Sequence, residues 1–535
     1  MFRPVAAAVV LDTVAVVVQL MLMTANARFP MATVFPSTVD VVPQTEQKKM
    51  KACVNRSCAR TQKEDTEIGE LPDEILVLIL SRLTVNEAAR TSVLSRRWEH
   101  LWKYSTSSFD LRAPEVGFGW EGGSGSHLSR FSGKSNYANW VNRVLGSHRG
   151  QTLDEFRVFF KLGKNYEEMI SSWINFAIKK QVRVLELDLG FGRDNHHFTF
   201  PSLSHLGFSS FKNLSALYLS RIDITDQVIA DILSNCPLLE ELSVRYCSTL
   251  VDVQVNTGPN SVLSLKHFEI FRCGPIKSIE ISAVNLISFK FIGAMISLSI
   301  KNAPNLAQLE IGGDYCYGLI SDLGGLLLVH PCQLERLVLD LNCMTPVDAM
   351  KVFLRGFVQF CRVKYLELRV RLREQDEHSI LFLTVMIEAC PYLQIFRLEV
   401  TNYAMRRFLY EERSKDLPDL WRRISQRKPT MEDIRCFRAM DSNFPLPSRH
   451  HHNQNFLYQC LETVELVGFS GHPAELELAI YLLENAVWRL QRITIDPHLQ
   501  HFASGFMLAE KVQAARESAK QLETKLPLTA KLVIL

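Results

Sequence analysis

Charged and hydroxyl side chains alternate with leucine and other apolar residues along many short segments of this sequence. Their chemistry is that of recognition, because a polar side chain next to a buried leucine on an extended strand points to the opposite side. The candidate contacts for a partner molecule are Tyr218, Ser243, Arg245, Asp340, Glu367, Arg369, Arg397 and Glu399. Their charges have both signs, so they indicate neither an acidic nor a basic class of substrate.

The residues that could perform catalysis or bind a metal do not form a known arrangement. The sequence has no nucleotide-binding, zinc-protease or nucleophile motif in the strand-to-helix setting that such motifs require. Cys53 and Cys58 lack a second pair of ligands nearby, and three consecutive histidines at 450 to 452 cannot all converge on one ion. We therefore expect a binding protein without a catalytic centre, a cofactor or a metal.

The elements that position the recognition residues follow one repeated pattern: apolar, two residues, apolar, one residue, apolar. Most copies lie some 20 to 30 residues apart, which is the period of leucine-rich repeats. One unit cannot bury its apolar face alone, so stacked units should form a continuous core and a parallel sheet. Helical runs that end at Pro237 and Pro391 precede two of the strands and place Cys236 and Cys390 in the core. The copies begin at Leu153, Val182, Leu214, Leu239, Leu265, Leu286, Leu306, Leu334, Val363, Leu393, Leu461 and Leu490.

Residues 68 to 112 predict a compact pair of amphipathic helices. Pro72 suits the first helical position, and Asp73 and Glu74 complement the helix dipole in the first turn. Thr84 or Asn86 can cap the second helix, which extends to Trp98, Leu101 and Trp102. The first helix has one apolar stripe, formed by Ile75, Leu76, Ile79, Leu80 and Leu83. So short a segment cannot bury the apolar stripes of both helices against itself, which implies a partner.

This segment resembles the plant form of the F-box, the helical module that docks on the Skp-type adaptor of a cullin ubiquitin ligase. The likeness is carried by Leu71 and Pro72, by the apolar spacing and by the Val-Leu-Ser-Arg-Arg-Trp run at 93 to 98. A plain helical hairpin of the next domain is the alternative. The resemblance implies that the adaptor, and through it a cullin, is bound by Leu71, Pro72, Ile75, Ile79, Leu83, Val93, Leu94 and Trp98.

The segment from 461 to 497 reads as a strand, a glycine-rich turn, an amphipathic helix and a second strand. It resembles the FBD-type module that closes many plant F-box proteins with leucine-rich repeats. Gly468, Phe469, Gly471, the helical residues 477 to 483 and the Ile-Asp-Pro run at 495 to 497 carry the likeness. Such a unit would cover the open edge and the apolar face of the last repeat.

Composition bounds the partners and the compartment. The 60 basic and 57 acidic residues are nearly balanced, so we expect no nucleic-acid partner. Scattered cysteines favour a reducing compartment, the nucleus or the cytoplasm. An apolar run at 5 to 23, followed by Ala25-Asn26-Ala27, resembles a secretory signal, but Asp12 interrupts it and Met31 is an alternative start. Entry into the secretory pathway remains the alternative, and a membrane partner is not expected.

The sequence thus predicts an α/β protein with a short helical F-box, a leucine-rich-repeat solenoid of parallel strands and helices, and an FBD-like α/β cap. The expected boundaries are 1–66 for an apolar run and a disordered tail, 67–112 for the F-box, 113–150 for a Gly/Ser-rich linker and leading helix, 151–402 for the repeats, 403–455 for a basic and polar insertion, 456–498 for the FBD-like repeat and 499–535 for a final helix and tail.

The predicted function is that of a non-catalytic substrate receptor of a cullin-type ubiquitin ligase, with an unidentified protein as substrate. Two alternatives remain open. The first is a scaffold that binds the adaptor without turnover of any client. The second is a secreted or membrane protein that binds its ligand through the repeats.

Overall fold

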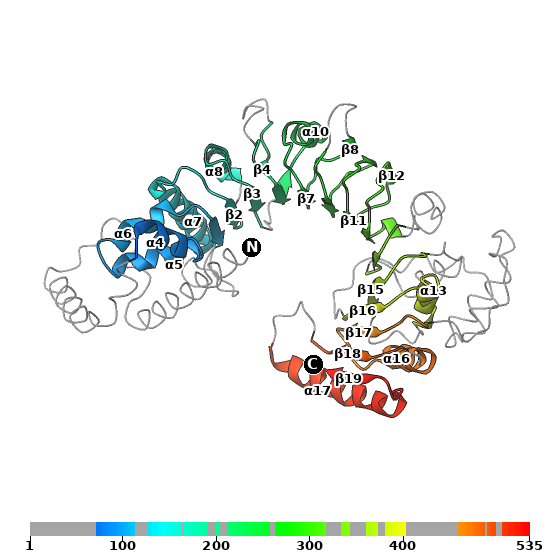
Figure 1. Ribbon diagram of the computed structural model, residues 1–535. Helices are drawn as coiled ribbons and strands as arrows, with labels where there is room; N and C mark the ends of the chain where they lie inside the picture. Colours follow the sequence, from blue (N-terminus) through cyan, green and yellow to red (C-terminus); the bar gives the residue numbers. More distant parts are fainter. Residues whose placement is uncertain are drawn as a thin grey trace, which may run out of the picture. The chain divides into compact units, whose positions relative to one another are not determined.

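The computed structural model describes residues 71–112, 127–162, 164–190, 198–202, 211–256, 263–316, 333–342, 360–372, 380–402, 458–486, 489–498 and 505–535 (Figure 1). The chain divides into two compact units. The first consists of Met1–Asp223 with Asn235–Leu239, and the second of Ile224–Ser234 with Glu240–Leu535. The apolar run at 5 to 23 and the segment predicted as an insertion at 403 to 455 lie outside the described residues.

The first unit begins with short helices: α4 (Asp73–Leu80), α5 (Val85–Arg90), η2 (Thr91–Val93), α6 (Trp98–Leu101) and η3 (Trp102–Tyr104). The sequence predicted Pro72 at the first helical position, but Pro72 has an extended backbone and is the N-cap residue, so α4 begins at Asp73. Thr84 caps α5 in a capping box with Glu87, whose carboxylate accepts from the Thr84 backbone N–H at 3.0 Å. The continuous second helix expected from the sequence is instead divided into short pieces.

The strands of the first unit are β1 (Ser108–Arg112), β2 (Glu155–Phe159), β3 (Val184–Asp188) and β5 (Ala216–Ser220), which pair in parallel in that order. Strand β1 was not anticipated, although Phe109 and Leu111 alternate as strand residues do, and both are buried. Helices α7 (His127–Ser147), η4 (Lys164–Tyr166) and α8 (Glu167–Lys179) belong to this unit. Short strands β4 (Phe198–Thr199) and β6 (Ile222–Asp223) form a separate pair.

The second unit has one long parallel sheet in the order β7-β9-β11-β13-β14-β15-β16-β17-β18-β19. Its strands contain the repeated leucine pattern, with the two closely spaced apolar residues of each unit on one buried face, as Leu366 and Leu368 show. Their bounds are β7 (Glu241–Arg245), β9 (His267–Phe271), β11 (Ser288–Ile292), β13 (Gln308–Gly312), β14 (Arg336–Asp340), β15 (Tyr365–Leu372), β16 (Ile395–Asn402), β17 (Thr463–Val467), β18 (Arg492–Asp496) and β19 (Lys531–Ile534).

A second small sheet takes the place of helices behind β7 to β13. Strands β8 (Asp252–Asn256), β10 (Ser278–Ser282) and β12 (Ser297–Lys301) pair in parallel in the order β12-β10-β8. Alternate residues such as Val253, Val255, Ile279 and Ile281 are buried. The repeats here are short, and an extended return segment spans a unit with fewer residues than a helix needs.

Helices pack along the remaining repeats: α10 (Asp226–Asn235), nearly all of which belongs to the second unit, η5 (Leu381–Leu383) with α13 (Thr384–Glu388), and α16 (Pro473–Asn485). Figure 1 shows α13 and α16 on the same side of the strands β15 to β18. Cys236 and Cys390 are buried, and burial raises the pKa of each thiol to about 12. Both cysteines therefore act as core residues, as the sequence predicted.

The chain closes with α17 (Gly505–Lys520), η8 (Gln521–Lys525) and β19. Strand β19 pairs in parallel with β18, so the segment predicted as a final helix and tail ends in an edge strand. Among the described residues no helix is long and apolar enough to cross a membrane. The same residues contain no cluster of histidine, cysteine and carboxylate side chains suited to a metal ion.

Candidate binding surfaces

The helices at 71 to 104 present apolar side chains that their own fold does not cover. Leu78 is 47% exposed and Leu94 is 37% exposed, Leu71 and Ile75 are half-buried, and Pro72 is exposed. Ile75 and Leu78 lie three residues apart on one side of α4, and Leu71 and Pro72 come directly before the helix. We call Leu71, Pro72, Ile75, Leu78 and Leu94 the docking face.

Arg97 fixes the start of α4, where the docking face begins. Its guanidinium donates to the Leu71 carbonyl at 2.5 Å and to Asp73 Oδ1, with Nε at 2.7 Å. Asp73 therefore serves both the helix dipole and an ion pair with a residue 24 positions away. In the sequence Arg97 stands out only as part of the Ser-Arg-Arg-Trp run, because its contact with α4 depends on tertiary packing.

The residues predicted to bind the adaptor separate into two groups. Ile79, Leu83 and Trp98 are at most 7% exposed and form the core of the helical module. Leu71, Pro72, Ile75 and Leu94 are accessible to a partner. The backbone of Val93 lies in η2, and its side chain is outside the described atoms. Leu78 was missed because it falls outside the apolar stripe, yet it is the most exposed apolar side chain of α4.

The helical module is joined to the first strands by direct hydrogen bonds. The Ser105 hydroxyl donates to Ser81 Oγ at 3.1 Å, and the backbone N–H of Arg149 donates to the Lys103 carbonyl at 2.7 Å. His148 lies 2.9 Å from the Ser105 carbonyl through Nε2, and burial lowers the pKa of its imidazole. The docking face is thus built on the same packed unit as β1 and β2.

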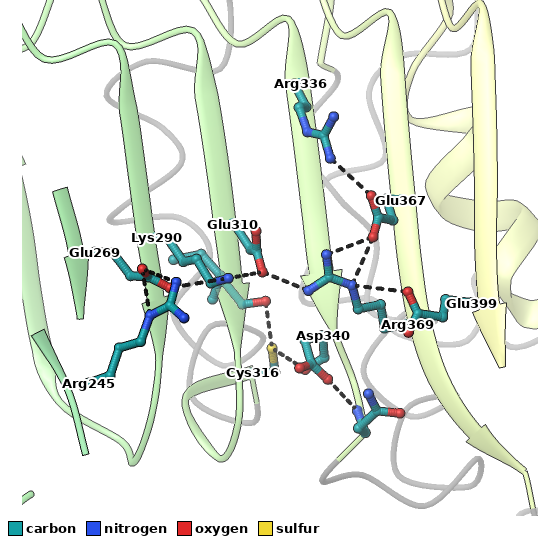
Figure 2. Close-up of polar contacts among 12 residues, drawn as sticks. Arg245, Glu269, Lys290, Glu310, Cys316, Arg336, Asp340, Glu367, Arg369 and Glu399 are labelled. Carbon is teal, nitrogen blue, oxygen red and sulfur yellow. Dashed lines mark hydrogen bonds and ion pairs between the residues drawn. The ribbon is translucent and has the colours of Figure 1, made fainter. Parts of the chain in front are cut away.

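The predicted substrate-contact residues of the second unit lie on the face of the long sheet opposite to the buried leucines. We call this the open face. Residues at the middle position of successive strands lie opposite one another: Ser243, Glu269, Lys290 and Glu310 on β7 to β13, then Glu367, Arg397 and Glu465 on β15 to β17. Val338 holds this position on β14 and is 1% exposed. Figure 2 shows the polar contacts along the central part of this face.

Glu367 is the most buried carboxylate of the open face, with a side chain 4% exposed. It accepts hydrogen bonds from Arg336 at 3.0 Å and from Arg369 Nε at 2.8 Å (Figure 2). The Tyr365 hydroxyl donates a third hydrogen bond to Glu367 at 2.9 Å. Burial alone would raise the pKa of Glu367, but Arg369, Tyr365 and Arg336 together hold it below its ordinary value. Burial, and then the Glu367 charge, raise the pKa of Tyr365 to about 12.

Arg369 connects neighbouring strands. It spans β14 to reach Glu310 on β13 at 2.7 Å, and its Nε lies 3.6 Å from Glu399 on β16 (Figure 2). Burial would lower the pKa of the guanidinium, but Glu310 and Glu367 outweigh it and raise the pKa. Arg397 pairs in the same way with Glu465 at 3.0 Å. These charges therefore satisfy one another across the sheet.

A second group of paired charges surrounds Glu269. Its Oε2 accepts from Ser243 at 2.7 Å. It also accepts from Arg245 at 2.7 Å, and Lys290 lies 3.3 Å from Oε1 and 3.0 Å from Glu310 (Figure 2). Burial would raise the pKa of Glu269, but Ser243, Lys290 and Arg245 hold it below its ordinary value.

The predicted substrate contacts are thus mostly occupied within the protein itself. Ser243 and Glu367 are buried, Arg369, Arg397, Glu399 and Asp340 are half-buried, and Arg245 is exposed. Asp340 Oδ1 accepts from the Asn342 backbone N–H at 3.0 Å. Tyr218 lies on β5 of the first unit, opposite Glu186 in the register with β3. Their role in substrate binding stays a prediction.

Family models match three successive parts of the chain. The F-box domain matches residues 68–109, the LRR domain of At1g61320/AtMIF1 matches 203–438, and the FBD matches 456–495. The order of these matches is the order predicted from the sequence. The F-box match coincides with the docking-face module, and the FBD match covers β17, α16 and most of β18.

The chain is similar to proteins from Arabidopsis thaliana whose names include the F-box. F-box/LRR-repeat protein At3g03360 is 28% identical over 46% of this chain and 51% of its own length. F-box protein At1g80960 is 29% identical over 41% of this chain and 48% of its own length. F-box/FBD/LRR-repeat protein At1g13570 is 24% identical over 81% of this chain and 91% of its own length. The chain thus spans about half the length of the first two relatives.

Proposed function

Because the chain belongs to the plant F-box, leucine-rich-repeat and FBD family, we propose that it is the substrate-recognition subunit of a cullin-type ubiquitin ligase. On this proposal the F-box binds a Skp-type adaptor, and through it a cullin, while the repeats bind a protein substrate. The chain positions the substrate and carries no ubiquitin thioester itself. It would act in the nucleus or the cytoplasm, where the adaptor is accessible.

The observation that carries the proposal is the docking face at the F-box. Leu78 and Leu94 expose apolar area that the described part of the F-box leaves uncovered, although the same module buries Ile79, Leu83 and Trp98. Burying each large apolar side chain contributes about 1.5 to 3 kcal/mol. Association and side-chain ordering offset several kcal/mol of that sum, so the loss of one or two anchors should weaken binding strongly.

The proposal is tested by following assembly and turnover in the same cells. Wild-type chain and a Leu78→Glu variant are each captured and probed for the adaptor and for the cullin. Proteins bound to both forms are then measured for ubiquitin load and half-life. A substrate receptor predicts that the wild type alone recovers the adaptor and shortens the half-life of a bound protein.

Two results would contradict this role. If the wild type binds the adaptor but changes no bound protein's half-life, the chain is a scaffold. If neither form binds the adaptor, the F-box has only a structural part in this protein. Leu528→Glu provides the matched control, because Leu528 is a fully exposed leucine far along the chain from the F-box.

A further inference from the structure

The open face of the second unit is not uniform at its rim. Along β13 to β17 the cations Arg369, Arg397 and Arg336 all lie on carboxylates. Around the carboxyl ends of β7 and β9, by contrast, Arg245 pairs with Glu269, Lys290 on the neighbouring β11 lies between Glu269 and Glu310, and Arg272 follows β9. Arg272 is exposed, and it forms no ion pair within the described part of the chain. This end of the open face therefore has a local surplus of positive charge.

Two aromatic rings lie among these cations. Tyr246 and Phe271 pack edge to face with their ring centres 5.3 Å apart, and both side chains are half-buried. The Arg272 guanidinium lies 5.5 Å from the Phe271 ring centre, and the Lys290 ammonium lies 5.6 Å from it. Ring faces next to a guanidinium hold its plane in place, which prepares the group for a carboxylate. We call Arg245, Tyr246, Phe271, Arg272 and Lys290 the cationic rim.

The backbone supplies an independent observation. Tyr246 and Arg272 each follow the last residue of a strand and adopt positive φ values of 55° and 48°. Gly313 and Gly468 occupy the corresponding place after β13 and β17, with φ values of 77° and 71°. A left-handed conformation costs little for glycine and more for tyrosine or arginine. Two large side chains thus stand next to each other in the sheet at positions where glycine would be less strained.

We propose that the cationic rim binds an acidic segment of the protein substrate, with Arg272 as its main ion-pair donor. This inference rests on the proposed function and specifies the substrate chemistry for it. Arg272 and the free edge of the Arg245 guanidinium would pair with carboxylates, and the exposed parts of Tyr246 and Phe271 would contact the aliphatic stems between them. A nucleic acid fits less well, because a phosphate backbone needs a longer row of unpaired cations.

The test uses the purified full-length chain and a fluorescein-labelled octaglutamate peptide, with octaserine, octalysine and an RNA oligonucleotide as competing probes. We expect octaglutamate to bind, more weakly as salt rises, and Arg272→Gly to weaken it about tenfold. The same substitution removes the backbone strain, so the thermal midpoint should stay equal or rise. A purely structural Arg272 predicts the reverse, a lower midpoint with unchanged peptide binding.

Asn302→Gly is the matched control. Asn302 follows β12 with a φ of 41°, so the change relieves the same kind of backbone but removes no cation. It should leave octaglutamate binding unchanged. Equal binding by the wild type and Arg272→Gly, or tighter binding of octalysine or RNA than of octaglutamate, would overturn the proposal.

Adaptor binding is measured on the same preparations. Arg272→Gly should keep it, because Arg272 is in the second unit and the docking face is in the first. If the adaptor does not bind the wild type while Arg272→Gly still loses the peptide, the substrate-receptor role fails and the acidic-segment site stands. If the wild type binds the adaptor and Arg272→Gly still binds the peptide, the acidic-segment site fails and the substrate-receptor role stands.

Discussion

The F-box and the open face of the second unit leave different kinds of surface uncovered. The F-box has a buried core that includes Trp98, and it leaves Leu78 and Leu94 exposed. What it offers a partner is therefore apolar surface. The open face instead pairs Arg369 with Glu310 and Glu367, so most of its charges are already satisfied. A partner of the F-box can therefore be inferred from what is exposed, whereas a partner of the repeats cannot be inferred from the mere presence of charge.

The largest expected effect on the free energy of unfolding is at the core of the F-box, in contrast to its docking face. Trp98→Ala should lower the free energy of unfolding by about 3 to 5 kcal/mol, because a large buried side chain leaves a cavity. Leu78→Ala should change it by less than about 0.5 kcal/mol, yet weaken adaptor binding about tenfold. Denaturant unfolding and adaptor titration of both variants check this. Equal stability of the two variants would break the distinction.

The next effect concerns the buried carboxylate of the open face. Glu367→Ala leaves Arg369 and Arg336 without their shared partner and should cost about 3 kcal/mol of unfolding free energy. Glu399→Ala should cost less than about 1 kcal/mol, because its contact with Arg369 is longer and the side chain is more exposed. Chemical denaturation compares them. If Glu367→Ala proved as mild as Glu399→Ala, the charges of this face would not be tightly coupled.

A pH-dependent effect is expected at Glu475 in the FBD region. Its carboxylate is buried, and desolvation raises its pKa to about 7 despite hydrogen bonds from the Ser470 and His472 backbone N–H groups. Protonated Glu475 is therefore favoured more in the folded state than in the unfolded state. Its contribution to the free energy of unfolding is fully present below the ordinary pKa of a glutamate and is lost as the pH rises through about 7.

Glu475→Gln should remove that part of the pH dependence between about 4.5 and 7. Thermal unfolding of both forms at several pH values in this window measures the difference. Glu477→Gln, on the same helix, is the control, and parallel pH profiles for wild type and Glu475→Gln would contradict the assignment.

The smallest effect is expected at the exposed pair Lys301 and Glu280, on the small sheet β8-β10-β12. Their charged atoms lie 2.5 Å apart, but the Lys301 side chain is 65% exposed. Solvent screening should limit the effect of Lys301→Ala to less than about 1 kcal/mol, and salt should reduce it further. Urea unfolding at low and high salt checks this. A loss as large as that for Glu367→Ala would remove the contrast between exposed and buried pairs.

The strands were predictable because their signal is local. The spacing of Leu366 and Leu368, or of Ile493 and Ile495, determines which residues of a strand are buried, and each predicted copy is a strand in the structure. The strands β8, β10 and β12 were missed because a repeat of this kind was expected to return through a helix. Alternation in Val253 and Val255 was the signal that could have revealed them.

Which charged side chains of the open face pair with one another was not predictable in the same way. Arg369 and Glu310 are 59 residues apart in sequence, and their contact depends on the order and register of three strands. Leu78 is exposed for a similar reason, since a helical stripe does not reveal which neighbours will cover it. Sequence thus indicated which helix and which strands form the candidate surfaces, and tertiary packing decided which side chains on them are accessible.

The most direct test is titration of the purified full-length chain with a Skp-type adaptor, for the wild type and an Ile75→Glu/Leu78→Glu variant. Both changes place a charge on the docking face and leave the buried Ile79 and Trp98 in place. We predict saturable binding by the wild type and its loss in the variant, with an unchanged unfolding transition. Equal binding by the two folded proteins, or no binding by either, would contradict adaptor docking through this face.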